Sequence, residues 1–504
     1  MSYLMILEVS QKQAYIFSSN KLKDNIRHSE NICRVTDPEY FEAVAASEGM
    51  AFSQKDNVVY SGGGHTVLEF QREEQAKSFA YVVSKTVKRD FPGLELFIKT
   101  EPYDEKEPPG ENLKKLSEAL EVKKSVRRAS FGQGTFGVEK MDASSRKAKP
   151  LAKPEEGHGQ NRREYVPDGY RTASRFEDLG NSKHTSSFIA VVHIDGNAMG
   201  KRVERLRQEH RNEAWEPYKA ALKRFSDSID RDFKNSYREM ADRVAESLRK
   251  GAGEKLDLKE NYFPVRQIIL AGDDVCFVTE GRIGLEAARI FIEQLAQKRN
   301  QQDRAAYTAC AGVAVVHQKY PFYKAYELAE MLCSNAKRTI AEYGAEGNAC
   351  AIDWHIEFGE LEDSIEALRR NYITSDNCHL ELRPYILSAE PDLLEKEPVR
   401  RYENFKKFVS VIQQEKMSCA RGKLKELREA LREGETASEY YLKSSLLGIL
   451  SVTGYEGVYK DVSMDRLFSG KGLDRKTFIK TGDNKKRSLF FDGIEIIDTF
   501  VALD

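Results

Sequence analysis

The sequence predicts an α+β protein with several domains, and three observations support this prediction. The chain has 504 residues, too many for one ordinary hydrophobic core. Apolar runs of strand length alternate with longer stretches of helical period over residues 1–358. The remaining third, residues 359–504, contains mainly helical patterns. We therefore expect two α+β units followed by a helical C-terminal domain.

The first expected unit spans residues 1–105. It opens with a strand over residues 3–9, and a polar, helix-compatible stretch follows over 11–34. In NVVYSGGGHTVLEF, residues 57–70, two apolar runs flank consecutive glycines, which supply the positive φ that tight hairpins need. The other elements expected in this unit are a helix and a strand, over residues 73–89 and 94–98.

Residues 106–184 are expected to be a charged linker or insertion. They contain Pro, Gly, Ser and dense charge with little periodicity. Between Glu121 and Tyr165 the chain has 11 Lys plus Arg and 6 Asp plus Glu, a net charge of +5. A solvated flexible segment would explain this composition, and contact with nucleic acid is the alternative.

The second expected unit spans residues 185–358 and has the order strand, helices, hairpin, helix, strand, helix, strand. These elements are expected over 188–194, helices up to about 248, then 265–280, 285–299, 306–316, 323–343 and 349–356. An antiparallel sheet with helices on one face is the economical packing of this order. The order is that of a ferredoxin-like, palm-type domain.

The C-terminal third is expected to be a helical bundle. One of its helices should open with the capping box Thr436-Ala-Ser-Glu439. The other helical patterns cover residues 361–372, 399–416 and 420–432.

Bulk composition excludes several protein classes. The seven cysteines are scattered without CxxC spacing, which argues against a disulfide framework and a zinc ribbon. Lys plus Arg total 79 and Asp plus Glu total 80, so any nucleic-acid site must be local. No apolar run is long enough to span a bilayer, and the N-terminus does not resemble a signal peptide. We therefore expect a cytoplasmic protein with no membrane partner.

Three carboxylates are the main chemical signal. Asp195 ends the apolar run FIAVVHI, while Asp273 and Asp274 lie in the turn of the hairpin LAGDDVCF. Carboxylates at the ends of buried strands need a counter-charge, which Mg²⁺ or Mn²⁺ would provide together with substrate phosphates. Two such ions can stabilise the attacking and leaving oxygens of an in-line displacement. A Gly-Asp-Asp sequence alone would also suit an ordinary polar turn.

The residues that follow Asp195 support a nucleotide site. Gly196 and Asn197 stand where the strand gives way to a helix, so the backbone could approach a triphosphate closely. Gly272, in the facing hairpin, is assigned to the same site.

The second unit resembles the catalytic palm of the large subunit of type III CRISPR effector complexes, which is related to GGDEF diguanylate cyclases and adenylyl cyclases. The matching segments are HIDGNAMGK, LAGDDVCF and AGVAVVHQKYPFYKAYELAEMLCSNAKR. The first unit is similar to the first palm of the same family through LEVSQKQAYIFSSNKLKDNIRHSENI and VVYSGGGHTVLEF. The resemblance covers most of residues 1–100 and 187–356.

This resemblance implies two ferredoxin-like palm domains and an enzyme that makes cyclic oligoadenylates from ATP. By position, Asp195, Asp273 and Asp274 match the catalytic, metal-binding carboxylates. Lys337 matches a lysine that faces nucleotide phosphates, although a solvated helical lysine is an equal alternative. The turn matching the nucleotide-facing turn of the non-catalytic palm, which could also be a plain hairpin loop, is Ser61, Gly62, Gly63 and Gly64.

Glu8 corresponds to Asp195 in the first palm, but no paired carboxylates accompany it, so we expect this palm to bind nucleotide without doing chemistry. The sequence departs from the family in three ways. Ala271 replaces the first glycine of GGDD, no HD dipeptide marks a nuclease domain, and the zinc-binding cysteines between the palms are missing. A reduced relative is expected, with ATP or other nucleoside triphosphates, subunits of a guide-RNA complex, or a second copy of the chain as partners. The alternative is a non-catalytic, nucleotide-binding scaffold of such a complex.

Overall fold

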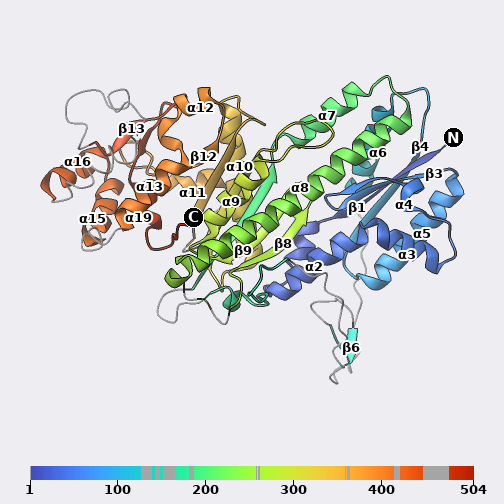
Figure 1. Cartoon of the computed structure of the whole chain (residues 1–504), viewed down its shortest axis with the longest axis horizontal. Helices are drawn as coiled ribbons and strands as arrows, with labels where there is room; N and C mark the ends of the chain where they lie inside the picture. Colours follow the sequence, from blue (N-terminus) through green and yellow to red (C-terminus); the bar gives the residue numbers. More distant parts are fainter. Residues whose placement is uncertain are drawn as a thin grey trace.

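The computed structural model describes residues 2–126, 139–141, 148–150, 165–180, 187–256, 258, 261–357, 359, 364–413, 421–445 and 476–504. The described residues contain two large β-sheets, each covered by helices on both faces (Figure 1). The N-terminal sheet lies at one end, the second sheet in the middle and the C-terminal helices at the other end (Figure 1). The α+β class is therefore confirmed.

The first sheet is antiparallel, with strand order β2-β3-β1-β4. Its strands are β1 (Tyr3–Ser10), β2 (Val58–Gly62), β3 (His65–Phe70) and β4 (Glu95–Pro102). The helices of this unit are α1 (Lys12–Ile16), α2 (Leu22–Val35), α3 (Pro38–Ser47), α4 (Gln54–Asn57), α5 (Glu73–Asp90) and α6 (Pro109–Ser125). The expected strands, the hairpin and the helix over 73–89 are all present.

Both faces of β1 are buried, because its side chains alternate between two hydrophobic clusters. Met5 and Leu7 pack with α2, α3 and α5, whereas Leu4 and Ile6 pack with α6 on the opposite face. Helix α6 thus belongs to the first unit, although residues 106–184 were expected to be a linker. Its apolar positions are three to four residues apart but are diluted by lysines and glutamates, which hid the periodicity.

The second sheet has six strands, in the order β12-β11-β10-β7-β9-β8. Its strands are β7 (Phe188–Gly196), β8 (Val265–Ala271), β9 (Asp274–Glu280), β10 (Ala309–His317), β11 (Cys350–Ile356) and β12 (Tyr385–Ser388). Its helices are α7 (Met199–Glu209), α8 (Trp215–Arg249), α9 (Gly284–Ala296) and α10 (Phe322–Glu342). A separate pair, β5 (Glu139–Met141) and β6 (Ala148–Pro150), lies within the expected linker.

The expectation of an antiparallel sheet with helices on one face is wrong in two respects. Strand β11 runs parallel to β10, and the helices cover both faces. Val192 and Ile194 of β7 pack with α8 and α9, while Ile189 and Val191 pack with α10 and with α2 of the first unit. Gly312 permits the close approach of α10, since a Cβ there would lie 1.9 Å from a helix carbonyl oxygen. Central strands of this kind are apolar at every position, so periodicity could not reveal the second covered face.

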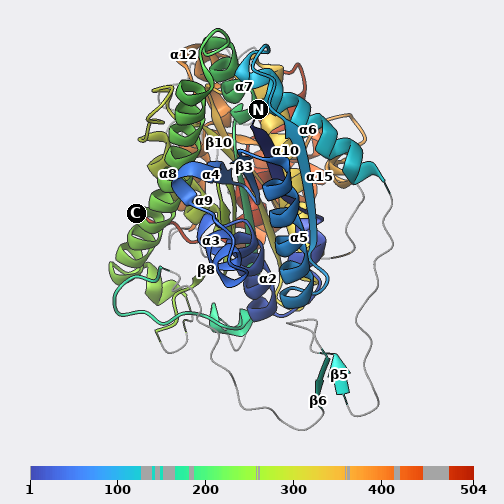
Figure 2. The ribbon, with the colours of Figure 1, turned by 90° about the vertical axis from the view of Figure 1, so that its right-hand side faces the viewer.

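The two units exchange helices. Helix α8 of the second unit runs along both sheets and packs on β2 of the first, while α2 of the first unit packs on β8 of the second (Figures 1 and 2). Buried side chains of β1, α2, β7, β9 and α10 form one continuous cluster. The two units are therefore fixed against each other by a shared hydrophobic core.

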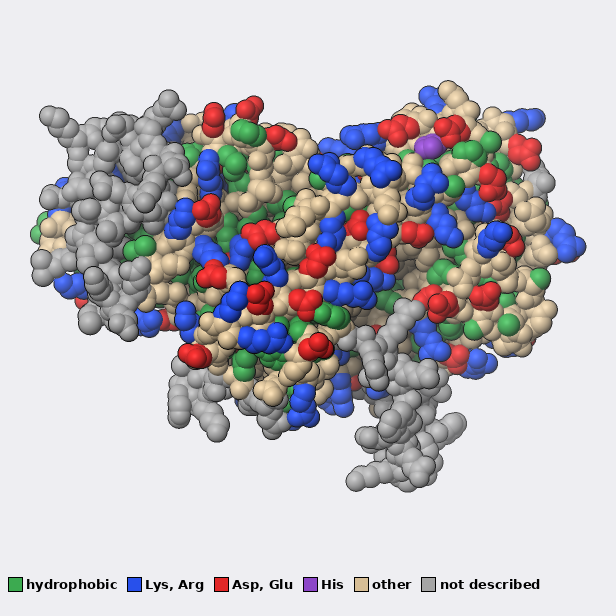
Figure 3. Space-filling view, in the orientation of Figure 1, with side chains coloured by type: hydrophobic (Ala, Val, Ile, Leu, Met, Phe, Trp, Pro, Cys, Tyr) green, Lys and Arg blue, Asp and Glu red, His purple; other side chains and the backbone are tan. Residues whose placement is uncertain are grey.

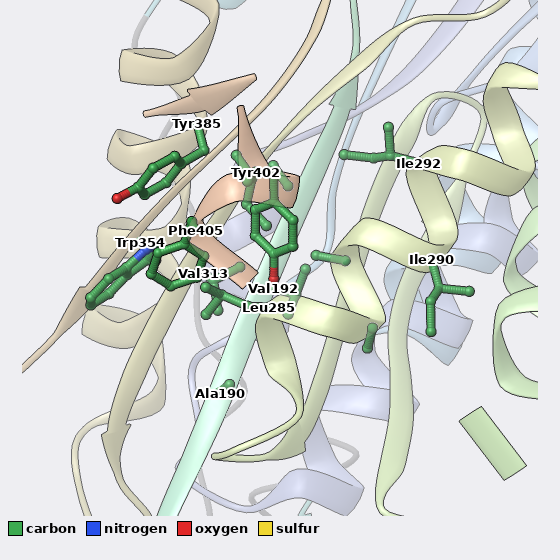
Figure 4. Close-up of a cluster of buried hydrophobic side chains, with 14 of the residues drawn as sticks. Ala190, Val192, Leu285, Ile290, Ile292, Val313, Trp354, Tyr385, Tyr402 and Phe405 are labelled. Atoms are coloured by element: carbon green, nitrogen blue, oxygen red, sulfur yellow. The ribbon is translucent and has the colours of Figure 1, made fainter. Parts of the chain in front are cut away.

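The C-terminal third is mainly helical, as expected, but it is joined to the second sheet. Its β12 extends the second sheet, and Phe405 of α13 (Tyr402–Gln413) packs between Trp354 of β11 and Tyr385 of β12 (Figure 4). The other elements of this region are α11 (Ile365–Arg370), α12 (Pro391–Lys396), α15 (Arg421–Arg432), α16 (Glu435–Ser444), α19 (Phe491–Ile496) and the hairpin β13 (Phe478–Lys480) and β14 (Lys486–Ser488).

The expected capping box is also wrong. Helix α16 begins at Glu435, with Gly434 as its N-cap, so Thr436 lies inside the helix. Glu435 donates its backbone N–H to Asp376, a contact distant in sequence that replaces the local cap.

The visible surface carries acidic and basic side chains in mixture, as the balanced composition predicts (Figure 3). Within the described ranges, every helix is too short or too polar to cross a bilayer. The six cysteines in the described part form no disulfide with one another, and Cys419 lies outside it. The carboxylates of the second unit therefore remain the main candidates for a functional site.

Candidate nucleotide site between the two sheets

The structure brings the three expected carboxylates to one edge of the second sheet. Asp195 near the end of β7 lies directly opposite Asp274, the first residue of β9. Residues opposite each other in an antiparallel pair share a face, with Cβ atoms roughly 4.5–5.5 Å apart. Asp273 occupies the turn before β9, and its backbone carbonyl accepts a hydrogen bond of 3.3 Å from the Gly196 N–H.

The two glycines of this edge have different roles. Gly272 has φ +64, which suits the first position of a tight hairpin turn. Gly196 lets the turn approach β7, since a Cβ atom there would lie 3.0 Å from the Cβ of Asp273. Ala271 lies at the end of β8 and is not among the residues with positive φ. Alanine at this position therefore imposes no backbone strain beside the carboxylates.

The carboxylates lack a full counter-charge. Burial and the charge of Asp195 raise the pKa of Asp273 to about 6 and that of Asp274 to about 7. The side chain of Asp274 is nevertheless 46% exposed, because it borders a cavity. Its Oδ1 has no hydrogen-bond partner among the described residues, and the nearest basic atom, His193 Nδ1, is 3.6 Å away. This oxygen itself is buried, so the exposed remainder of the side chain is the part that faces the cavity.

The side chain of Lys337 already contacts one of the three carboxylates. Its ammonium, carried by α10, donates to Asp195 Oδ2 at 2.7 Å and to the Gly196 carbonyl at 2.8 Å. Burial alone would lower the pKa of Lys337, but the pairing with Asp195 outweighs it and the net shift is upward. Lys337 is therefore held as a cation at the site and is not a freely solvated helical lysine.

Asn197 is placed at the site but its side chain has a structural task. Its Nδ2 donates to the Ala349 carbonyl at 2.9 Å, and its backbone N–H donates to the Thr308 carbonyl at 2.8 Å. The next residue, Ala198, has φ +56 and redirects the chain from β7 into α7. Asn197 thus ties the end of β7 to the strands beside it.

The glycine turn of the first sheet lies against the turn of the second. A Cβ atom at Gly272 would be 3.5 Å from the Gly63 nitrogen. Gly63 and Gly64 have φ +58 and +79, as a type I′ turn requires. Ser61 points away from this contact, since its hydroxyl bonds to the Thr36 carbonyl at 2.8 Å. Gly62 faces α8, where a Cβ would lie 3.1 Å from the Ser226 hydroxyl.

A cavity of about 650 Å³ lies between the two sheets beside these turns. Among the expected site residues it is lined by Gly63, Gly64 and Asp274, whereas Asp195, Asp273 and Lys337 do not line it. Its size is within the range of small-molecule sites. The other residues that line it are Glu8, Val9, Ser10, Gln11, Lys12, Gln13, Ala14, Ile16, Ser29, Ile32, Cys33, Lys124, Ile269 and Ala271.

Sequence reasoning missed three polar residues of this region. Lys12 follows β1 and contacts the Gly63 carbonyl, Lys124 of α6 donates to Glu8 at 2.7 Å, and His193 lies two residues before Asp195. The signal for the first of these lies in the backbone conformation, which the sequence alone does not give. Gln11 and Ala198, each at the N-cap of the helix after the first strand of its unit, have φ +50 and +56, so the segment after Glu8 repeats the segment after Asp195.

The carboxylate oxygens of this site are ligands of the type that Mg²⁺ and Mn²⁺ prefer, but they do not surround an ion on all sides. In the part of the chain that the structure describes, no group of three or more His, Cys, Asp or Glu residues is arranged to hold a metal. Magnesium usually takes one or two carboxylates and completes its shell with water and substrate phosphates. The partly exposed Asp274 carboxylate at the cavity suits such a partial site.

Comparisons with known proteins agree with this geometry. Residues 188–342 match the family model of the second palm domain of Cas10/Cmr2. Among solved structures, a Csm1–Csm4 subcomplex of the type III-A CRISPR-Csm interference complex is similar, with a TM-score of 0.57 and 16% identity over 99% of this chain and 70% of that chain. A Csm1–Csm4 cassette in complex with cA4 has a TM-score of 0.55, with the same identity and coverage. Csm1 of T. onnurineus has a TM-score of 0.53 at 16% identity, over 99% of this chain and 69% of that chain.

Among curated proteins, no sequence matches this chain. The structural likenesses show the fold, and the family model identifies residues 188–342 as a palm domain. The expected fold of two palms, and the expected resemblance to the large subunit of type III CRISPR complexes, are confirmed.

Proposed function

We propose that this chain, whose residues 188–342 form a second palm domain of the Cas10/Cmr2 type, is a nucleotidyltransferase. It would join nucleoside triphosphates, with ATP as the first candidate, into cyclic oligonucleotides and release pyrophosphate. The chain would act as the large subunit of an RNA-guided antiviral effector complex. Structures of the similar Csm1–Csm4 cassette with one ATP, with pppApA, and with cA3 support the choice of ATP.

The observation that carries this proposal is the meeting of the two palms at their turns. Gly272 of the second palm faces Gly63 of the first, since a Cβ atom added at Gly272 would lie 3.5 Å from the Gly63 nitrogen. A nucleotide in the cavity beside Gly63 would therefore lie next to Asp274. Two nucleotides held on the two sides of this contact would have their reacting groups close together. Such positioning by itself supplies a large part of a transfer reaction's rate enhancement.

The residues of the second palm have distinct tasks in this proposal. Asp195, Asp273 and Asp274 would hold Mg²⁺ or Mn²⁺, which when bound neutralises triphosphate charge and activates the leaving pyrophosphate. Lys337 holds a positive charge beside Asp195, where phosphate oxygens would enter. Gly196 and Gly272 keep side chains out of the space between strand and turn. The shared core fixes the two palms against each other, and it would thereby fix the relative placement of two bound nucleotides.

A nucleotide-binding scaffold without turnover is the second candidate. It is favoured by the lack, among the described residues, of a ready group of three metal ligands. The replacement of glycine by Ala271 does not favour it, because Ala271 has no strained backbone. Both candidates require nucleotide binding, so binding and turnover must be measured separately.

The decisive experiment incubates the purified full chain with ATP or GTP and with Mg²⁺ or Mn²⁺, and resolves the products by mass. If the chain transfers nucleotidyl groups, oligonucleotide products and pyrophosphate should accumulate in parallel. Thermal melting of the same samples reports binding, and the metal should raise the melting temperature chiefly when a triphosphate is present. Joint stabilisation without products would establish the scaffold. A melting temperature indifferent to metal and nucleotide would contradict both candidates.

A further inference from the structure

The cavity between the palms is lined by a lysine, Lys12, that the family comparison does not assign. Lys12, the first residue of α1, extends across the glycine turn of the first palm, and its ammonium donates to the Gly63 carbonyl. Its path depends on the turn, since a Cβ atom at Gly64 would lie 2.7 Å from Lys12 Cε and 2.8 Å from Nζ. Lys12 and Gly64 are therefore matched to each other.

The ammonium of Lys12 has hydrogen-bonding capacity to spare. A lysine carries three N–H donors, and among the described residues the acceptor that Lys12 contacts is the Gly63 carbonyl. Lys124, the other lysine of the cavity, differs because it is paired with Glu8 and Glu121 at 2.7 Å each. Burial lowers the pKa of Lys12, and the charges of Glu8 and Asp274 oppose this shift. A cation that is partly desolvated and has no carboxylate within ion-pair distance in the described chain favours an anionic ligand.

The first palm lacks the carboxylates that would hold a metal in the second palm. In register, Gly64 and His65 of the first hairpin take the places of Asp273 and Asp274. The first palm therefore has no paired carboxylates for a metal, and the charge of a phosphate on this side must be met in another way. Lys12 is the lysine at that position.

We propose that Lys12 binds a phosphate of the nucleotide held against the Gly63–Gly64 turn, and that this binding does not require a divalent metal. The proposal rests on the proposed function, since it assumes that the cavity takes a nucleoside triphosphate. Ile16, Ile32 and Ile269 provide apolar wall in the same cavity for the remainder of the ligand. Asp274 marks the end of the cavity nearest the second palm, so the phosphate would lie between a cation of one palm and a carboxylate of the other.

Binding of ATP and of adenosine to the full chain in the presence of EDTA tests this proposal. Without metal, the carboxylates of the second palm repel a triphosphate, so the remaining ATP binding reports the first palm. Lys12→Met keeps the length and apolar stem of the side chain and removes the charge. It should weaken ATP binding by roughly tenfold or more, the usual effect of one charged hydrogen bond, and leave adenosine binding unchanged. Lys12→Arg should restore most of the ATP affinity.

The controls separate the possible outcomes. Lys77→Met removes an exposed lysine of α5 that pairs with Glu73, and it should change neither affinity. Equal loss of ATP and adenosine affinity in Lys12→Met would overturn the proposal, because it would mean that Lys12 only fixes the turn. Unchanged ATP binding would overturn it as well. Wild-type protein that binds ATP with magnesium but not with EDTA would overturn metal-independent binding and leave the proposed function standing. Failure to bind ATP under both conditions would contradict the proposed function itself.

Discussion

The two palms have the same framework and differ at a few chemically decisive positions. The first sheet has the order β2-β3-β1-β4, and β8, β9, β7 and β10 follow the same order in the second. In the first palm Glu8 lies opposite His65, and in the second Asp195 lies opposite Asp274. A shared topology places a hairpin turn beside the end of the central strand in both palms, but only one turn carries carboxylates.

Even the lysine beside the carboxylate is repeated. Lys124 of α6, the helix after the fourth strand, donates to Glu8, as Lys337 of α10 donates to Asp195. The exchange of α2 and α8 between the sheets follows the same internal two-fold relation. The difference teaches that the fold places a hairpin turn and a lysine at equivalent positions in both palms, and that paired carboxylates distinguish the second palm from the first.

Among the variants that test this difference between the palms, removal of the hairpin carboxylates should change activity most. We expect Asp273→Asn with Asp274→Asn to reduce pyrophosphate release by roughly 10³-fold or more, because the amides cannot hold the metal. The melting temperature should stay within about 2 °C of wild type or rise, since the change removes repulsion between buried charges. Asp230→Asn on the surface of α8 is the matched control and should retain activity. Full turnover in the double variant would exclude these residues from the chemistry.

Lys337→Met should have the next largest effect. Loss of an ammonium that donates to Asp195 and to the Gly196 carbonyl should lower kcat/KM by roughly 10–100-fold. Lys124→Met makes the equivalent change in the first palm, and its effect should fall mainly on KM. Steady-state kinetics on both variants measure the split. Equal loss of kcat in the two would show that the palms do not differ in their roles.

Gly63→Leu should have a smaller effect, limited to the first palm. A bulky side chain at the contact between the two turns should raise KM by roughly fivefold, the effect of about 1 kcal/mol, before it disturbs the carboxylates. Gly49→Leu controls for backbone strain, because Gly49 has a similar φ of +67 and open space around it. Gly63 has φ +58. If both variants behave alike, the turn is only a turn and the nucleotides meet elsewhere, for example across two copies of the chain.

The smallest expected effects are opposite pH dependences of stability in the two palms. Burial, then the charge of Asp195, raises the pKa of Asp274 to about 7, so between about pH 4 and 7 the folded state binds more protons than the unfolded state. This contribution to stability falls as pH rises. Burial, then the charge of Lys12, lowers the pKa of His65 to about 4, so its contribution rises between about pH 4 and 6.5.

Melting curves in EDTA at pH 5 and pH 6.5 test these signs. Relative to wild type, Asp274→Asn should gain stability as pH rises, and His65→Asn should lose it. Identical pH slopes in the three proteins would show that neither group titrates in this interval.

What the sequence by itself determined is most strands and helices of the two sheet-containing units and the positions of the candidate carboxylates. Apolar runs ending in Asp195 and enclosing Asp273 and Asp274 identified the strands and the hairpin, because carboxylates at the ends of buried strands are rare without a function. The consecutive glycines identified the second turn, since only glycine adopts positive φ freely at both turn positions. These features are local, so a single sequence contains them. The roles of the site residues stay predictions until the variants are measured.

Only the tertiary structure decided how the units combine. Three features depend on which apolar faces meet: the second helix layer on the palm sheet, the addition of β12 to that sheet, and the exchange of α2 and α8. Many alternative pairings of apolar faces would bury similar area with similar hydrophobic free energy, so the sequence alone does not select among them. The contact between Gly63 and Gly272 joins residues more than 200 positions apart, and it places Lys12 beside Asp274 in the cavity. No periodicity or motif encodes such a distance, because it arises from the packing of two complete sheets.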